Sequence, residues 1–203
     1  MEFENIFPTI IGKSQLKCPD DLYNTWINYI INLEKNEGII RANKITSDNL
    51  TKEERLLDHY IFRDLKFLIL KEVKKYVNKI DVPLEDFSIS NSWGYVVGKD
   101  NYDGNYHRHD NSFISGVFYL TDGAPIEFLN PFNTTQIIKW ATDIQENPSY
   151  FHRIAPFKGL LNLFPSSLVH RVTKHIEDNS RVCIAFNIFP KGYFGTSYGN
   201  FEI

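Results

Sequence analysis

The chain has 203 residues, 42% of them hydrophobic and 23% charged, which is the composition of one globular domain with a packed core. Its formal net charge of −3 at pH 7 gives no overall basic field of the kind that nucleic-acid-binding domains use, so nucleic acid is not an expected partner. Aromatic residues make up 15% of the chain, and this abundance favours strands.

Helical periodicity dominates residues 1–82. Asp20 and Asp21 mark a helix start, and Gly38 gives the stop. Between these signals, apolar side chains recur at helical spacing, at Leu22, Trp26, Tyr29, Ile30 and Leu33. This pattern predicts a first helix of about five turns.

A second helix is predicted after a polar connection. Residues 51–54 have the pattern of a capping box, and the apolar positions that follow continue a helix toward residue 77. Pro83 then ends the helical region, because proline cannot continue a helix.

After Pro83 the hydrophobic period becomes two, which predicts strands. In residues 87–97, two sets of residues alternate: Phe87, Ile89, Asn91, Trp93, Tyr95 and Val97 in one set, and Ser88, Ser90, Ser92 and Gly94 in the other. Further strands are predicted at residues 113–120, 125–129, 135–140, 151–157, 160–164, 168–172 and 181–189. About eight short strands separated by turn signals predict a sandwich or jelly roll. With two helices beside it, the expected class is α+β and mostly β.

The two cysteines bear on the cellular compartment. Cys18 and Cys183 stand far apart and outside any CxxC pattern, so no disulfide framework is expected. The first residues lack the basic and then apolar pattern of a signal peptide. No apolar run approaches the roughly 20 residues of a membrane helix. We therefore expect a soluble cytoplasmic protein without a membrane partner.

A candidate metal site begins with His107 and His109, which flank Arg108. Alternate residues of an extended strand point to the same face, so both imidazoles can aim at one point while Arg108 faces away. His170, on a later predicted strand, would complete a three-nitrogen site that leaves metal positions open. The alternative is a solvated surface pair, which an isolated His-x-His in a polar loop usually is.

Arg181 opens a predicted strand, eleven positions after His170. Alternation places Arg181, Cys183, Ala185 and Asn187 on one face, and Val182, Ile184 and Phe186 on the other. An arginine in an apolar strand calls for an anionic partner, and its planar fork suits a carboxylate. An edge arginine in water or in a structural salt bridge is the alternative.

Several stretches stand in a characteristic order: residues 6–9, 107–120, 126–131 and 159–166, then His170 and residues 181–187. With them, nearly the whole chain resembles the Fe(II)- and 2-oxoglutarate-dependent oxygenases. More narrowly, it is similar to a family of 2OG-Fe(II) oxygenases that is frequent in phages and marine bacteria.

The resemblance implies a double-stranded β-helix, a form of jelly roll, in one oxygenase domain over residues 1–203. Residues 1–82 would be its helical part and residues 83–203 its core with the metal site. It also implies that His107, His109 and His170 hold Fe(II), with no catalytic residue beyond the metal centre, and that Arg181 binds the distal carboxylate of 2-oxoglutarate. A hydroxyl residue often assists two positions after that arginine, where this chain has Cys183, and Tyr119 could supply a phenol instead.

The chain departs from the superfamily pattern at His109, where an aspartate is usual. The expected function is a dioxygenase that couples 2-oxoglutarate decarboxylation to hydroxylation of a protein side chain or a small molecule. One alternative is a cupin-like three-histidine metalloenzyme that uses no 2-oxoglutarate. Another is a non-catalytic jelly-roll binding protein. A separate alternative concerns the metal ligands: a nearby aspartate, in place of His109, would complete the ordinary set of two histidines and one carboxylate.

Overall fold

The structure is a computed structural model, and it describes residues 1–2, 8–37, 55–82, 86–100, 104–131, 150–196 and 199–202. Within these ranges the elements are, in chain order, β1 (Gly12–Gln15), α1 (Asp20–Glu37), the 3-10 turns η2 (Leu56–Asp58) and η3 (Tyr60–Phe62), α2 (Arg63–Lys79), β2 (Asp86–Val97), β3 (Ile114–Tyr119), β4 (Ile126–Leu129), β5 (Phe151–Ile154), β6 (Leu160–Pro165), β7 (His170–Val172), β8 (Arg181–Lys191), β9 (Tyr193–Thr196) and β10 (Gly199–Glu202).

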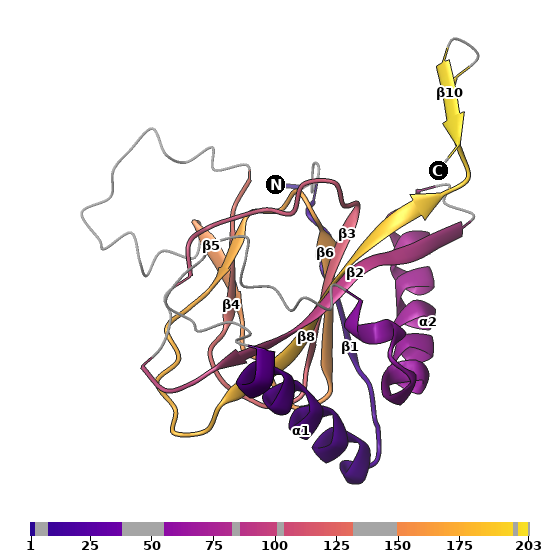
Figure 1. The fold of residues 1–203 in the computed structure, drawn as a ribbon. Coiled ribbons are helices and arrows are strands. Elements are labelled where there is room, and N and C mark those ends of the chain that lie inside the picture. The colour runs from indigo at the N-terminus through magenta and orange to yellow at the C-terminus, as the bar shows by residue number, and fades with distance from the viewer. Residues whose placement is uncertain are drawn as a thin grey trace.

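Two antiparallel sheets face each other. The major sheet has the strand order β1-β6-β3-β8-β2, and the minor sheet has the order β5-β4-β7. Helices α1 and α2 cover the side of the major sheet that faces away from the minor sheet, and the β9–β10 hairpin extends away from both (Figure 1). This architecture is the predicted jelly roll with two N-terminal helices packed on it. No helix of the described ranges is long and apolar enough to cross a membrane.

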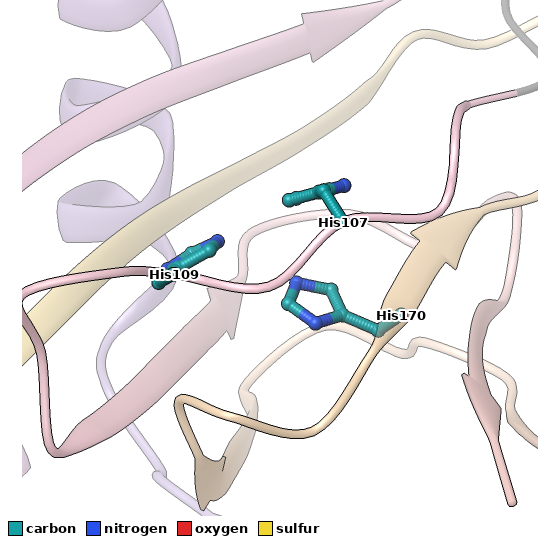
Figure 2. Close-up of side chains that lie close together, drawn as sticks. All are labelled: His107, His109 and His170. Atoms are coloured by element: carbon teal, nitrogen blue, oxygen red, sulfur yellow. The ribbon is translucent and has the colours of Figure 1, made fainter. Parts of the chain in front are cut away.

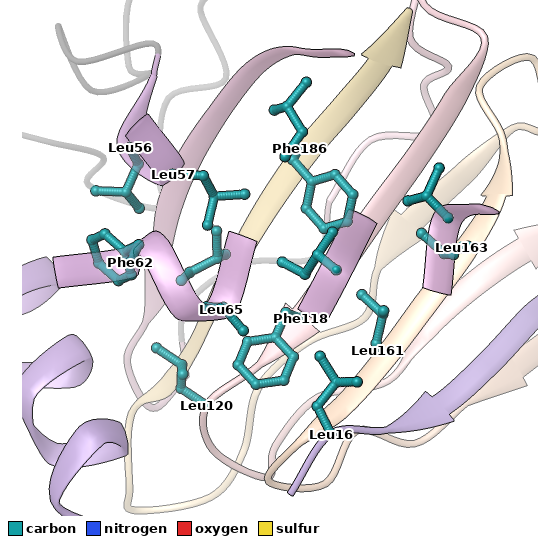
Figure 3. Close-up of a cluster of buried hydrophobic side chains, with 14 of the residues drawn as sticks. Leu16, Leu56, Leu57, Phe62, Leu65, Phe118, Leu120, Leu161, Leu163 and Phe186 are labelled. Atoms are coloured by element: carbon teal, nitrogen blue, oxygen red, sulfur yellow. The ribbon is translucent and has the colours of Figure 1, made fainter. Parts of the chain in front are cut away.

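Strand β8 runs through the middle of the domain, so both of its faces are covered. Val182, Ile184 and Phe186 pack in the cluster beneath the helices, whereas Cys183 and Ala185 pack against the minor sheet. The predicted alternation of this strand is therefore confirmed. Figure 3 shows the cluster beneath the helices, to which Leu16, Leu56, Leu57, Phe62, Leu65, Phe118, Leu120, Leu161, Leu163 and Phe186 contribute. Burying each such side chain stabilises the fold by roughly 1.5–3 kcal/mol.

The first helix agrees with its prediction, and the second begins later than its apolar pattern suggested. Residues 56–62 form two 3-10 turns before α2 starts at Arg63. Two backbone groups of these turns bond to side chains of other elements and not within a helix. The Leu57 amide donates to Ser92 Oγ (2.9 Å), and the Ile61 carbonyl accepts from Trp26 Nε1 (2.9 Å). The capping box predicted at 51–54 and the end at Pro83 lie outside the described residues.

A bulge in β2 corrects the predicted alternation of that strand. Ile89 pairs with Ile188, but Asn91 pairs with Asn187, so Ser90 is an extra residue in the ladder. One inserted residue reverses which side chains face which layer. Ile89 therefore packs beneath the helices, whereas Trp93 and Tyr95 turn to the interior between the sheets.

The other predicted strands appear as β3 to β8 with shifts at their ends, and residues 135–140 lie outside the described part. Strands β1, β9 and β10 were not predicted. The sequence of β1 is Gly12-Lys13-Ser14-Gln15, which carries no apolar alternation, yet it pairs with β6 at the edge of the major sheet. The mostly helical N-terminal part thus supplies one strand to the sheet.

Candidate metal centre and buried polar cluster

The segment around His107 lies against β7 and positions two of the three histidines. The His107 amide donates to the His170 carbonyl (2.9 Å), and the His170 amide donates to the His107 carbonyl (2.9 Å). Gly104 and His109 extend this pairing with bonds to the carbonyls of Val172 (2.9 Å) and Ser166 (3.0 Å). The minor sheet therefore gains one further short antiparallel partner, which places His107 directly opposite His170.

The three imidazoles converge (Figure 2). Ring centroids lie 4.5 Å apart for His107 and His170, 5.1 Å for His109 and His170, and 5.4 Å for His107 and His109. One ring nitrogen from each lies within 4.8 Å of the others. His170 is buried, His109 is half-buried and His107 is exposed, so the cluster opens to the surface on the His107 side.

Each imidazole has an oxygen acceptor next to Nδ1. The partners are the Asn105 carbonyl for His107 (3.0 Å), Asn187 Oδ1 for His109 (2.7 Å) and the Leu168 carbonyl for His170 (2.9 Å). Because a carbonyl oxygen only accepts, Nδ1 carries the proton and Nε2 keeps a lone pair. A metal-binding histidine usually has this arrangement, with its second nitrogen donating to an oxygen that orients the ring.

Burial keeps the inner imidazoles neutral. It lowers the pKa of His170 to about 3, with a smaller contribution from the charge of His107. Burial likewise lowers the pKa of His109, although the hydrogen bond with Asn187 acts in the opposite direction. Neutral imidazole is the form that binds a metal, so both rings are ready for ligation near neutral pH.

No carboxylate joins the histidine cluster in the described part of the chain. Asp110 follows His109 directly, but its side chain is exposed and pairs with Arg108 at 3.3 Å. The local sequence thus does not place Asp110 where the aspartate of an ordinary ligand set would lie. The three-histidine arrangement is what the described residues offer a metal ion.

Arg181 is buried on the inner face of β8, with only 1% of its surface exposed. Its Nε donates to the Ala124 carbonyl (3.0 Å), and Nη1 contacts Cys183 Sγ (3.3 Å). The guanidinium carbon lies 5.1 Å from the centre of the Tyr119 ring. None of the ion pairs found among the described residues involves Arg181. A buried guanidinium without a carboxylate partner is unusual, because the desolvation of its charge is not offset.

Two neutral polar side chains, Tyr119 beside Arg181 and Asn162 beside Tyr119, are buried without a hydrogen bond to the described residues. The atoms concerned are Tyr119 Oη and both polar side-chain atoms of Asn162. Burial raises the pKa of Tyr119 to about 12, and the nearby Arg181 charge and Asn162 amide only partly oppose this. The phenol therefore remains a hydrogen-bond donor at neutral pH. An unpartnered buried polar group costs about 1–3 kcal/mol, so the side chains of Arg181, Tyr119 and Asn162 suit an anionic ligand rich in acceptors.

Asn162 was not among the residues singled out from sequence, although a signal was present. It is the one polar residue in the otherwise apolar run 160–164, in phase with Leu160 and Phe164 on the inner face. Cys183, which was expected beside Arg181, is buried there, and burial raises the pKa of its thiol. The Cys183 thiol sulfur accepts from Arg181 Nη1.

Comparison with known proteins shows which family part of the chain is similar to. Residues 91–187 match the model of the family described as Putative 2OG-Fe(II) oxygenase. The chain carries a 2OG-Fe(II) oxygenase domain. Among curated proteins, none matches the chain.

Several solved structures share the fold of this oxygenase domain. A prolyl-4-hydroxylase from Pseudomonas putida aligns with a TM-score of 0.62 and 15% identity, over 91% of this chain and 94% of that one. HygX from Streptomyces hygroscopicus, solved with nickel and 2-oxoglutarate bound, aligns with a TM-score of 0.58 and 12% identity, over 90% and 82%. SnoN, the non-heme alpha ketoglutarate dependent epimerase from nogalamycin biosynthesis, aligns with a TM-score of 0.63 and 11% identity, over 94% and 81%. At these identities the likeness concerns the fold alone.

Three further side chains of the oxygenase domain lie near the site or bear on its histidines. Trp93 is partly buried and packs against the core between the sheets, with its ring 5.8 Å from that of His109. His175 is fully buried: its Nδ1 lies 3.2 Å from the Ala124 amide and 2.8 Å from the Glu177 carboxylate, and its Nε2 lies 2.5 Å from the Asn179 carbonyl. His152 is exposed on β5.

Proposed function

We propose that this protein is an Fe(II) dioxygenase that couples decarboxylation of 2-oxoglutarate to hydroxylation of a substrate. One observation carries the proposal: the inner side of the barrel combines three converging imidazoles with a buried arginine that has no carboxylate partner in the described part of the chain. The family match and the ligands named for HygX support the same assignment.

The three histidines would hold Fe(II) through their Nε2 atoms, because Nδ1 of each ring faces an acceptor. Bound Fe(II) supplies the redox chemistry with dioxygen and 2-oxoglutarate. The protein contributes position, since the imidazoles come from the His107 segment and from β7, which are locked by paired backbone hydrogen bonds. Three neutral ligands leave the charge of the ion to be balanced by an anion, and the 2-oxoglutarate dianion meets that need.

The buried polar side chains of Arg181 on β8, Tyr119 on β3 and Asn162 on β6 would hold the far carboxylate of 2-oxoglutarate. Arg181 offers a guanidinium, Tyr119 a phenol and Asn162 an amide, and no hydrogen bond of 3.5 Å or less joins the last two side chains to the described residues. A carboxylate placed among them accepts from all three and compensates the buried positive charge. Tyr119 and Asn162 would thereby supply the hydrogen bonds that a hydroxyl residue often supplies at the position where this chain has Cys183.

A three-histidine metalloenzyme that uses no 2-oxoglutarate is the second candidate. It is favoured by His109, which stands where a carboxylate ligand is usual. In that case Arg181 would hold a different anion, and metal-dependent turnover would proceed without release of succinate.

The test is an anaerobic titration with Fe(II) and 2-oxoglutarate, followed by measurement of succinate after oxygen is admitted. We expect a visible charge-transfer band in the titration and succinate release that depends on 2-oxoglutarate. Arg181→Met should raise the Kd for 2-oxoglutarate about 10- to 100-fold, because a charged hydrogen bond contributes roughly 1.5–3 kcal/mol. Metal affinity should change far less.

Arg63→Met is the matched control, since Arg63 is exposed on α2. It should bind 2-oxoglutarate as the wild type does. Absence of both the band and succinate in the wild type would refute the use of 2-oxoglutarate and leave the second candidate.

A further inference from the structure

A buried carboxylate lies directly behind the histidine cluster. The side chain of Glu127, at the centre of β4, has no exposed surface. Its Oε2 accepts from Arg153 Nε on β5 (2.5 Å), and its Oε1 accepts from Arg171 Nε on β7 (2.7 Å) and from Tyr106 Oη (2.5 Å). Arg153 and Arg171 are the residues opposite Glu127 in the two flanking strands. One carboxylate thus joins three strands and the segment that precedes His107.

This cluster lies on the opposite face of the same backbone from the candidate ligands. Tyr106 immediately precedes His107, and Arg171 immediately follows His170. Neighbouring residues in extended chain point to opposite faces, so Tyr106 and Arg171 turn outward where the two histidines turn inward. The Arg171 guanidinium also lies over the Tyr106 ring, 4.6 Å from its centre.

Stability alone gives little reason for a carboxylate at this position. Burial by itself would raise the pKa of Glu127, but the hydrogen bonds from Tyr106, Arg171 and Arg153 outweigh it and hold the pKa below its ordinary value. Removing two charges from water offsets most of their attraction, so apolar residues of similar size often stabilise a fold equally well. Unlike an apolar side chain, the Glu127 carboxylate makes directional hydrogen bonds, and these fix the positions of Arg153, Arg171 and Tyr106.

The His107 segment needs such fixing. Its backbone bonds to β7 and to Ser166 run along one edge only, and His107 and Tyr106 are both exposed. The hydrogen bond from Tyr106 to Glu127 adds a side-chain link from this segment to the centre of the minor sheet.

We propose that Glu127 and Tyr106 are positioning residues, which hold His107 opposite His170 at the separation that a metal ion requires. The inference rests on the proposed function, because it assigns these residues to the geometry of the same metal site. Neither residue would touch the ion or a substrate. Glu127 acts through Tyr106 on His107, and through Arg171 on the strand that carries His170.

The test compares Tyr106→Phe with Tyr76→Phe. Each variant loses one tyrosine hydroxyl, but Tyr76 Oη donates to the Ile10 carbonyl (2.7 Å) in the helical layer, away from the histidines. Removing an outer partner of a metal ligand typically weakens metal binding 10- to 100-fold. We expect Tyr106→Phe to raise the Kd for Mn(II) about tenfold or more, and Tyr76→Phe to leave it within about twofold of wild type.

Two further measurements separate positioning from a general loss of structure. In chelator, amide exchange at His107 should become faster in Tyr106→Phe, while exchange in β8 stays as in the wild type. In a His107→Ala background, Tyr106→Phe should weaken Mn(II) binding no further, because the ligand through which it acts is gone. Glu127→Gln should weaken Mn(II) binding in the same direction as Tyr106→Phe.

An unchanged Kd for Mn(II) in Tyr106→Phe, beside a wild type that binds Mn(II), would overturn this inference and leave the metal site intact. The inference would also be overturned if Tyr106→Phe still weakened Mn(II) binding tenfold in the His107→Ala background. A wild type that binds no Mn(II) or Fe(II) would overturn the proposed function itself, and this inference with it.

Discussion

His170 shows how burial, more than any neighbouring charge, selects the chemical form of a residue. Its imidazole is 4% exposed, and its pKa is lowered from 6.5 to about 3. In the unfolded chain the ring takes up a proton as the pH falls below 6.5, whereas the folded, metal-free protein does not. The unfolded state then binds more protons, so folding stability is complete above pH 6.5 and is lost as the pH falls toward 3.

The prediction at this residue concerns stability against pH in the presence of chelator. Between pH 6 and pH 5, His170 should lower the free energy of unfolding by about 1 kcal/mol per pH unit, and His109 should add to this. Urea unfolding of His170→Asn should show a smaller slope than the wild type. His152→Asn, which changes an exposed imidazole, should keep the wild-type slope. Equal slopes in all three proteins would contradict the assignment.

Among single residues, the sequence indicated the site only partly. The spacing of His107 and His109 predicted a pair of imidazoles that the structure does bring together, and the phase of Arg181 predicted the inner-face position that it has on β8. The sequence did not predict Glu127 or Asn162 as site residues, because a single glutamate or asparagine in a strand is ordinarily exposed to solvent. Their importance follows from what lies opposite them in other strands, which a linear pattern does not contain.

At the scale of elements, the contact between α1 and β2 depends on a glycine. A Cβ atom placed at Gly94 would lie 2.7 Å from Ile30 Cγ2 and 3.5 Å from Ile30 Cβ. The helix can therefore approach the strand this closely only because Gly94 has no side chain. The bulge at Ser90 contributes to this contact, since it turns Gly94 toward the helix instead of the barrel interior.

We predict that Gly94→Ala destabilises the protein by about 1–3 kcal/mol through overpacking, as measured by urea unfolding. Ile30→Ala should destabilise by about 2–5 kcal/mol because it leaves a cavity. The double variant should be less destabilised than the sum of the two, because the new methyl group occupies the space that Ile30 leaves. Strict additivity would show that α1 does not pack on Gly94 as described.

For the molecule as a whole, metal binding should be coupled to stability. A ligand that binds only the folded state stabilises it by about 2.7 kcal/mol at one hundred times its Kd, and for a domain of this size that raises Tm by roughly 5–10 °C. Mn(II) should therefore raise the Tm of the wild type relative to chelator. His107→Ala should show little of this rise, and His152→Ala, an exposed histidine outside the cluster, should show all of it. Equal rises in the three proteins would refute the ligand assignment.

The sequence by itself determined the class of fold, because burial follows periodicity: a period near 3.6 for α1 and a period of two in β3 and β8. It also determined which side chains could bind a metal, because an i, i+2 pair on extended chain shares a face. Only the tertiary structure decided that His170 lies opposite His107, that Asn162 joins Tyr119 beside Arg181, and that Glu127 stands behind the cluster. These meetings depend on strand order and register, which arise from the packing of distant segments and not from any local preference.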